Sequence, residues 1–549
     1  QIASSKRISA AVDVSSASTS NGAAIQLWDS NNTDAQRWVV EDAGSGYVFL
    51  KSANSGKVLD VAGGSTAPST RVQQYDLNKT RAQKWVPVKN ENGTVTFYSA
   101  LGGGLVLDVT GGSTESGAAL QTYRGNATAA QQFKLYDANP VVKSAGRTIA
   151  DGYYQINANG AQTCLDISGA SKANGAKVQV WQPNGTLAQC FKVTYGDDGF
   201  YSIQPANSAK SLDLAGGGLI PGTQIQQWAC DNGNKNQRWS IVDNGSGSYS
   251  IVSARNGLAI AATGVSSGAL VQSVEGGAST AGWSFSPFAA SIAEGSYTVS
   301  TSLNGGQVLD VASGSVSDGA NVQIYGSNST FAQKWYVRTS AVGLLTLQNV
   351  GSGLYLAANS DGNVVQSSNP ANDGAQWELR VQLGGLSLVN KANGKALDLS
   401  SANTANGSNV QTYAPNETAA QAWQFNSCEL VGEGFYEIAP MTNTNLRLDV
   451  DDASLDSGRN VKVWDSNGSL AQRWWVRGAG DGWYTLTACC SAKALDVKDA
   501  SAASGANVQQ WDRNGSNAQK WRFEMGDKGL TIVSALGTTL DVFGGSGSR

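Results

Sequence analysis

Residues 59–85 read LDVAGGSTAPSTRVQQYDLNKTRAQKW, and this stretch decides the fold. An LDV triplet is followed by a VQQY segment that begins at Val72 and by an AQKW segment that ends at Trp85. The same three segments recur along the chain with a period of about 48 residues, which is typical of a repeat architecture. Apolar and polar residues alternate in each copy, as they do in half-buried strands. The sequence therefore predicts short β-hairpins that pack on neighbouring copies.

An Asp marks each copy and stands at fixed distances from two aromatic residues. In nine copies a first aromatic follows the Asp by fifteen positions: Asp13 and Trp28, Asp60 and Tyr75, Asp108 and Tyr123, Asp166 and Trp181, Asp213 and Trp228, Asp310 and Tyr325, Asp398 and Tyr413, Asp449 and Trp464, and Asp496 and Trp511. Further on, a Gln precedes a second aromatic by two positions, as in Gln83 and Trp85. We expect the second aromatic and the apolar residues of LDV to form the core, and the first aromatic to lie at the surface.

Two further copies have lost these polar positions. One runs from Leu258 to Ala261 and the other from Leu354 to Ala357, and in both Ala stands where the Asp is expected. Their second aromatics, Trp283 and Trp377, remain. A twelfth copy begins at Asp541. Since the core residues survive where the Asp is lost, the Asp is expected to serve something other than folding.

The copies group in threes. An acidic residue followed by Gly opens the fourth, seventh and tenth copies, at Asp151, Glu294 and Glu433. One hairpin unit cannot bury its apolar face alone, so three copies are expected to form one domain. The predicted domains are 1–140, 141–289, 290–428 and 429–549. The first strand of the first domain and the last copy of the fourth are expected to be incomplete, so the chain is expected to be a window on a larger polypeptide.

Composition narrows the class of protein. The chain has 549 residues, 65 of them Gly, only 15% charged residues, and 38 basic against 42 acidic residues. Nucleic acid is not expected as a partner, because a phosphate binder needs a basic patch. Membrane insertion is not expected, since no apolar run approaches about eighteen residues. With no His, the chain lacks the usual general base and the commonest metal ligand, so we expect no cofactor, no metal and no enzyme.

The six cysteines are too irregularly spaced for a disulfide framework or a paired-cysteine metal site. Cys164 and Cys190 lie in one copy, and both flank predicted strands that meet in the expected fold. They could form a disulfide.

The order of LDV, VQxW or VQxY, and QxW, three times per domain, resembles the ricin-B-type lectin family, also known as carbohydrate-binding module family 13. The resemblance covers essentially the whole chain and implies an all-β fold of four tandem β-trefoil domains. In that family each repeat can hold a shallow sugar site, in which the Asp accepts hydrogen bonds from hydroxyls and the aromatic stacks on the ring. A pyranose suits such a pair, because it offers vicinal hydroxyls and an apolar C–H face.

The fifth copy matches the family pattern best, because an Asn that adds a sugar contact stands before the Gln that orients the Asp. Its site residues by resemblance are Asp213, Gln226, Trp228, Asn236 and Gln237. The other eight copies have Ala in place of Asn236. They carry instead an Asn three residues after the first aromatic: Asn31, Asn78, Asn126, Asn184, Asn328, Asn416, Asn467 and Asn514. These Asn residues either reach a ligand or close a turn, and their Asn-x-Thr or Asn-x-Ser context favours turns.

The resemblance implies an extracellular carbohydrate-binding array that attaches weakly and multivalently to glycans. Its expected setting is a larger secreted or cell-surface protein of bacterial type, whose other domains would be further partners and could include a catalytic one. The alternative is a structural spacer, scaffold or adhesin stalk whose sugar sites have drifted. The sequence does not name the sugar, because loop shape sets the selectivity.

Overall fold

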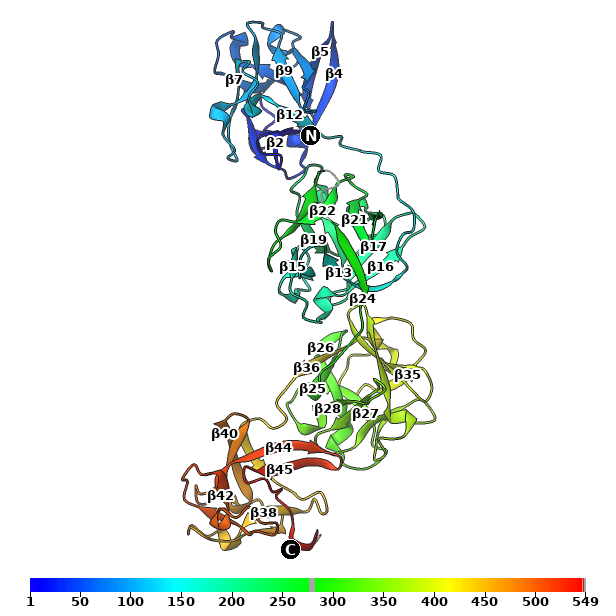
Figure 1. Cartoon of the computed structure of the whole chain (residues 1–549), viewed down its shortest axis with the longest axis vertical. Coiled ribbons are helices and arrows are strands. Elements are labelled where there is room, and N and C mark those ends of the chain that lie inside the picture. The colour runs from blue at the N-terminus through cyan, green and yellow to red at the C-terminus, as the bar shows by residue number, and fades with distance from the viewer. Residues whose placement is uncertain (276–281, 546, 548–549) are drawn as a thin grey trace. The chain divides into compact units, whose positions relative to one another are not determined.

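The computed structural model describes residues 1–275, 282–545 and 547, so part of the twelfth copy lies outside the described residues. Over this part of the chain every regular element is a β-strand or a short 3-10 turn, and the predicted all-β class is confirmed. The chain divides into two compact units, Gln1–Ala289 and Ala290–Arg549 (Figure 1). Each unit contains two large hydrophobic cores.

The second half of the first unit has the most complete topology. Its strands are β13 (Gly152–Ala158), β14 (Cys164–Ile167), β15 (Val178–Trp181), β16 (Phe191–Tyr195), β17 (Tyr201–Pro205), β18 (Ser211–Leu214), β19 (Ile225–Trp228), β20 (Trp239–Gly245), β21 (Ser248–Ser253), β22 (Ala259–Ala262), β23 (Val271–Val274) and β24 (Trp283–Pro287). In the order β13, β16, β17, β20, β21, β24 these strands pair side by side, and β24 pairs back to β13. The others form the hairpins β14–β15, β18–β19 and β22–β23. A six-stranded barrel closed by three hairpins is a β-trefoil.

The first half of the second unit repeats this plan. Its barrel strands are β25 (Gly295–Thr301), β28 (Trp335–Thr339), β29 (Leu345–Asn349), β32 (Trp377–Gln382), β33 (Gly385–Asn390) and β36 (Trp423–Ser427). Its hairpin strands are β26 (Asn304–Val311), β27 (Val322–Gly326), β30 (Tyr355–Ala358), β31 (Val364–Ser367), β34 (Ala396–Leu399) and β35 (Val410–Tyr413). The barrel closes where β36 pairs with β25.

The outer halves of the two units follow the same order. The first has barrel strands β1 (Ile2–Ser4), β4 (Trp38–Gly44), β5 (Tyr47–Ser52), β8 (Trp85–Lys89), β9 (Val95–Ser99) and β12 (Phe133–Leu135), with hairpin strands β2 (Ala10–Val14), β3 (Ile25–Asp29), β6 (Val58–Val61), β7 (Thr70–Tyr75), β10 (Leu105–Val109) and β11 (Leu120–Arg124). The last has barrel strands β37 (Gly434–Glu437), β40 (Arg473–Gly480), β41 (Trp483–Ala488), β44 (Trp521–Gly526) and β45 (Gly529–Ser534), with hairpin strands β38 (Leu446–Val450), β39 (Val461–Asp465), β42 (Ala494–Val497) and β43 (Val508–Trp511). The exact domain boundaries stay a prediction.

The second aromatics fill the cores, as the alternation predicts. Eight of them are at most 1% exposed: Trp85, Phe133, Phe191, Trp239, Trp335, Trp423, Trp474 and Trp521. Trp38 is the exception and is only partly buried. The indole Nε1–H of Trp239 donates to the carbonyl oxygen of Leu212 at 3.3 Å, which satisfies a polar group that burial would otherwise strand. This bond ties the barrel strand β20 to the hairpin strand β18, which carries Asp213.

Candidate functional site

The fifth copy places its predicted residues on one face of a hairpin. Strand β18 pairs with β19 so that Asp213 lies across from Gln226, and Ser211 lies across from Trp228. Side chains of paired residues share a face, and residues two apart in a strand share it too. Asp213, Gln226 and Trp228 therefore form one continuous surface, with the indole above the small side chain of Ser211.

The Asp213 carboxylate is buried and held by two glutamines. Asp213 is only 4% exposed. Gln226 Nε2 donates to Oδ1 at 2.9 Å, and Gln237 Nε2 donates to Oδ2 at 3.3 Å. Burial raises the pKa of this carboxyl above its usual value, while the hydrogen bonds from the two glutamines lower it. A carboxylate has about four acceptor positions, so two bonds leave room for a hydroxyl donor.

Gln237 also closes the loop that follows Trp228. Its Nε2 donates to the carbonyl oxygen of Ala229 at 2.9 Å, and its Oε1 accepts from the backbone N–H of Asp231 at 2.8 Å. The same side chain therefore fixes the loop and aims the carboxylate of Asp213. This is the orienting role that the resemblance implies for the Gln.

The other eight complete copies repeat the arrangement. Their Asp residues are 4–6% exposed, as Asp213 is: Asp13, Asp60, Asp108, Asp166, Asp310, Asp398, Asp449 and Asp496. The nine first aromatics are 37–54% exposed, which confirms that they lie at the surface: Trp28, Tyr75, Tyr123, Trp181, Trp228, Tyr325, Tyr413, Trp464 and Trp511. Burial raises the pKa of six of the nine carboxyls: Asp13, Asp60, Asp166, Asp213, Asp398 and Asp449.

The sequence analysis identified only one of the glutamines that lie across from the Asp. Eight copies have a Gln there, with Nε2 2.8–3.1 Å from the Asp Oδ1: Gln26, Gln73, Gln121, Gln179, Gln226, Gln323, Gln411 and Gln509. In the tenth copy Lys462 takes this place. These glutamines could have been identified from the sequence, because each occupies the Q position of the VQxW or VQxY segment.

The tight turn that follows the Asp was also not predicted from the sequence. In the fifth copy the 3-10 turn Ala215–Gly217 follows β18, and its middle residue, Gly216, has φ 59°. All nine complete copies have such a turn, with a left-handed middle residue that is Gly, Ser or Asp, residue types that tolerate this backbone or bond to it. Over the described residues 259–274 and 355–367, the degraded copies lack it. The turn therefore accompanies the site and not the core.

The eight repeated Asn residues close turns, as their context favours. The side-chain Oδ1 of Asn31 accepts from the backbone N–H of Thr33 at 3.1 Å, and the other seven make the same bond. In the fifth copy Asn236 packs against Gly217, where an added Cβ would lie 2.7 Å from Asn236 Oδ1. Asn236 thus borders the 3-10 turn beside Asp213.

The loop beyond this turn is covered by the first trefoil. Ile220 is 0% exposed and packs with Ala3 and Ala11. Asn32 Nδ2 donates to the carbonyl oxygen of Gly216 at 2.8 Å. A fragment holding residues 141–289 alone would expose Ile220, so binding experiments are best made on the whole chain.

The possible disulfide is not formed. Cys164 and Cys190 are both free, buried thiols, and burial raises the pKa of the Cys164 thiol to about 12. They lie on different elements, Cys164 on a hairpin strand and Cys190 at the end of a 3-10 turn. Shared proximity to strands that meet does not bring two side chains into bonding geometry.

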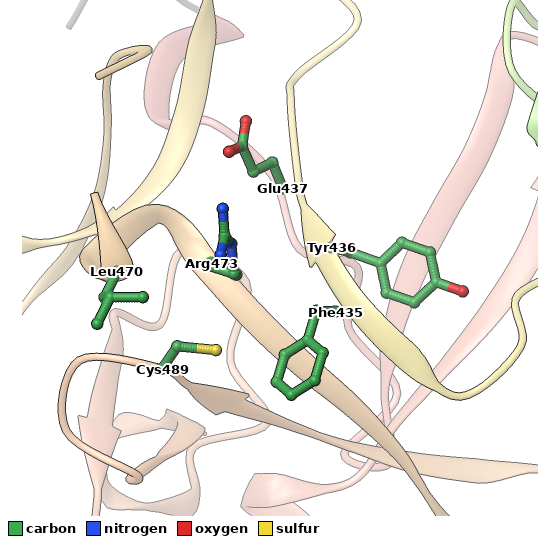
Figure 2. Close-up of a pocket in the computed structure, with 6 residues that line it drawn as sticks. All are labelled: Phe435, Tyr436, Glu437, Leu470, Arg473 and Cys489. Atoms are coloured by element: carbon green, nitrogen blue, oxygen red, sulfur yellow. The ribbon is translucent and has the colours of Figure 1, made fainter. Parts of the chain in front are cut away.

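A hollow of about 490 Å³ has none of the nine Asp and aromatic pairs in its lining (Figure 2). It is lined by Phe435, Tyr436, Glu437, Leu470, Arg473 and Cys489. Phe435 and Tyr436 are neighbours on β37, and their rings point in different directions.

The described residues lack the features of two other classes of site. They contain no cluster of three or more His, Cys, Asp or Glu side chains suited to a metal ion. They also contain no helix long and apolar enough to cross a membrane.

Comparison with known families identifies the class. A model described as ricin-type beta-trefoil lectin domain-like matches residues 1–75, 34–123, 81–181, 129–228, 187–273, 235–325, 331–413, 419–511 and 491–549. The chain therefore belongs to this family of β-trefoil lectin domains, as the resemblance predicts. Repeats of this kind imply carbohydrate binding and are generally non-catalytic.

Solved structures that match the chain include a mosquitocidal holotoxin, at 18% identity and a TM-score of 0.32, covering 100% of this chain and 66% of that one. A designed threefold-symmetric protein, ThreeFoil, is 33% identical over 25% of this chain and 96% of its own, with a TM-score of 0.24. The Rhizoctonia solani agglutinin is 30% identical over 25% of this chain and 99% of its own, with a TM-score of 0.24. The chain thus spans just under two thirds of the holotoxin chain. Among curated proteins, no match is found.

Proposed function

We propose that the chain is a non-enzymatic glycan-binding array whose sugar sites are drawn from the nine Asp and first-aromatic pairs. One observation carries the proposal: a buried carboxylate aimed by glutamines lies on the same hairpin face as an exposed aromatic ring, as with Asp213 and Trp228. The carboxylate would accept hydrogen bonds from vicinal hydroxyls, and the ring would stack on the C–H face of the sugar. At the fifth site Gln226 and Asn236 would add contacts, and Gln237 would orient Asp213.

Repetition along the chain would supply the affinity that one site lacks. A shallow site that holds one monosaccharide binds with a free energy of about −4 kcal/mol, which is a dissociation constant on the order of millimolar. Joining such sites in one chain raises the effective concentration of each for a multivalent glycan surface. We propose that the array works in this way on polysaccharides or on the sugars of glycoproteins and glycolipids.

The proposed setting is outside the cell, in a secreted or surface protein of bacterial type. Four trefoils with boundaries at residues 140, 289 and 428 would be its binding part. Other domains of a larger polypeptide would then be carried to a glycan surface, and any catalytic activity would belong to them.

A structural spacer, scaffold or adhesin stalk is the second candidate. The observation that favours it is the loss of the Asp and of the first aromatic in two copies, where Ala261 and Ala357 stand at the Asp position, across from Gln272 and Val365. If the remaining sites had drifted as far, the chain would keep its fold and bind nothing.

A glycan array separates the two candidates. The whole chain is compared with a variant in which all nine first aromatics are Ala, and thermal unfolding of both is recorded. We expect the parent to bind one or more glycans, and we expect the variant to bind none while unfolding near the parent temperature. Silence from a folded parent would favour the scaffold, and binding retained by the variant would place the sites elsewhere.

A further inference from the structure

The tenth copy differs from the other complete copies at two coupled positions. Across from its Asp449 stands Lys462, where the other eight have Gln. Two residues after Asp449 stands Asp451, where the others have Ser, Ala, Thr or, in the eleventh copy, Lys498. A cation at one position and a carboxylate at the other occur together only in this copy.

Lys462 bonds to groups of its own copy. Its ammonium forms an ion pair with Asp451, which also pairs with Arg459 Nη2 at 3.0 Å. The same ammonium lies 4.2 Å from the centroid of the Trp464 ring, within the range of a cation–π contact. The lysine is therefore held between a carboxylate and the face of the first aromatic.

Lys462 covers the Trp464 ring on the hairpin face that also carries Asp449. In the register of β38 and β39, Asp449 lies across from Lys462 and Arg447 lies across from Trp464. Residues two apart in a strand share a face, so Asp449, Lys462 and Trp464 occupy the positions of Asp213, Gln226 and Trp228 in the fifth copy. A pyranose that stacked on Trp464 and reached Asp449 would need the space that the Lys462 ammonium fills.

The charges around this site do not suit an anionic sugar as a replacement. Asp449, Asp451 and Asp452 place three carboxylates beside it, and Arg459 pairs with both Asp451 and Asp452. Arg447 on the same face is paired with Glu437, with Nε and Oε2 2.9 Å apart. The cations are already matched by carboxylates of the same trefoil.

We propose that Lys462 closes the tenth site to sugars, so that only the eleventh of the two complete sites in the last trefoil accepts a neutral sugar. The proposal rests on the proposed function and deepens it, because it names a residue that decides which copies bind. Lys462 acts by covering the ring, with Asp451 as the group that holds it there.

The test follows single indole resonances in the whole chain. The protein is labelled with ¹⁵N-tryptophan and titrated with galactose, glucose, mannose, N-acetylgalactosamine and N-acetylglucosamine in turn. Substitution of each Trp by Phe assigns the indole signals of Trp464 and Trp511. We expect at least one sugar to shift Trp511 and none to shift Trp464. In Lys462→Gln, which installs the residue found in eight other copies, we expect that sugar to shift Trp464 as well.

A transplant provides the matched control. Lys498→Asp with Gln509→Lys places the same pair in the eleventh copy, and we expect it to abolish the sugar-induced shift of Trp511. A Trp464 signal that shifts like Trp511 in the parent overturns the inference. So does a Trp464 signal that stays fixed in Lys462→Gln while Trp511 responds. If no sugar shifts Trp511 in the parent, the closing role of Lys462 is overturned, whereas the proposed function, which also includes four tyrosine sites, is judged by the glycan array.

Discussion

The fifth and eighth copies have the same core and different surfaces. In the fifth, Trp239 is buried and bonds to the carbonyl oxygen of Leu212; in the eighth, Trp377 is buried and bonds to that of Leu356 at 3.0 Å. The eighth copy nevertheless lacks the carboxylate, the exposed aromatic and the 3-10 turn after the Asp position. A hairpin can therefore keep its place in the trefoil after its polar surface is gone.

The losses in the eighth copy are correlated. Ala357 stands at the Asp position, and Ala375 stands where the orienting Gln belongs. Together with Tyr355 they form a small buried apolar cluster. A buried Gln whose Asp partner is replaced by Ala would be an unsatisfied polar group. Replacement of the Asp therefore favours replacement of the Gln as well. The Asp and Gln thus behave as a unit that serves the site, whereas the Trp serves the fold.

The largest effect is expected from the residue that the two copies share. Trp239→Ala and Trp377→Ala each remove a fully buried side chain and should each lower the free energy of unfolding by about 3–5 kcal/mol. Denaturant unfolding of the whole chain measures both, with the partly buried Trp38→Ala as a milder comparison. A loss at Trp377 much smaller than at Trp239 would mean that the eighth copy has lost its core role as well.

A smaller loss of stability is expected at the buried position where the fifth copy has Gln237 and the eighth has Ala375. Gln237→Ala removes a donor to the buried Asp213 carboxylate and both bonds to the loop after Trp228, and should cost about 1–3 kcal/mol. Ala375→Gln in the eighth copy is the matched reverse change. It should also destabilise the fold, because Ala357 offers no carboxylate to accept a hydrogen bond from the buried amide. Thermal unfolding of the two variants checks this, and a stabilising Ala375→Gln would contradict the view of Asp and Gln as a unit.

The exposed aromatic should be nearly silent in stability. Trp228→Ala is expected to change the free energy of unfolding by no more than about 0.5 kcal/mol, since the side chain is at the surface. It should abolish the sugar-induced shift of the Gln226 side-chain amide, which lies on the same face, in a ¹⁵N-glutamine spectrum. Ser367→Ala, at the corresponding place in the eighth copy, should leave both readouts unchanged. A large stability loss in Trp228→Ala would make that ring part of the core.

The smallest expected effect is a dependence on pH. Burial raises the folded-state pKa of Asp213, so the folded chain binds that proton more tightly than the unfolded chain does. The contribution of Asp213 to stability is then fully present below the unfolded pKa and is lost as pH rises through the folded one. The unfolding temperature of the parent minus that of Asp213→Asn should therefore fall between about pH 3 and about pH 7. Sugar binding at this site should strengthen as the pH rises over the same range, because a protonated carboxyl is a poorer acceptor. If the difference between the two unfolding temperatures rises instead, the Asp213 pKa is lowered.

Much of the molecule could be predicted from spacing alone. The repeat period, LDV and QxW predicted β-hairpins grouped in threes, and the family resemblance that they carry implied the β-trefoil plan. Strand alternation assigns Leu59 and Trp85 to the core whatever the loops do. The loss of the first aromatic in the two degraded copies predicted that Trp28 and its eight counterparts lie at the surface, and the context of Asn31 favoured a turn. These features depend on contacts within one copy or on a face that every copy must bury.

What only the tertiary structure decided depends on contacts between segments that spacing does not join. The burial of Asp213 to 4% exposure follows from packing around the hairpin. Ile220 is covered by another trefoil, and Cys164 and Cys190 remain unbonded in the interior. Period-two alternation tells which face a side chain occupies, but the distance between two side chains is set by how separate segments pack.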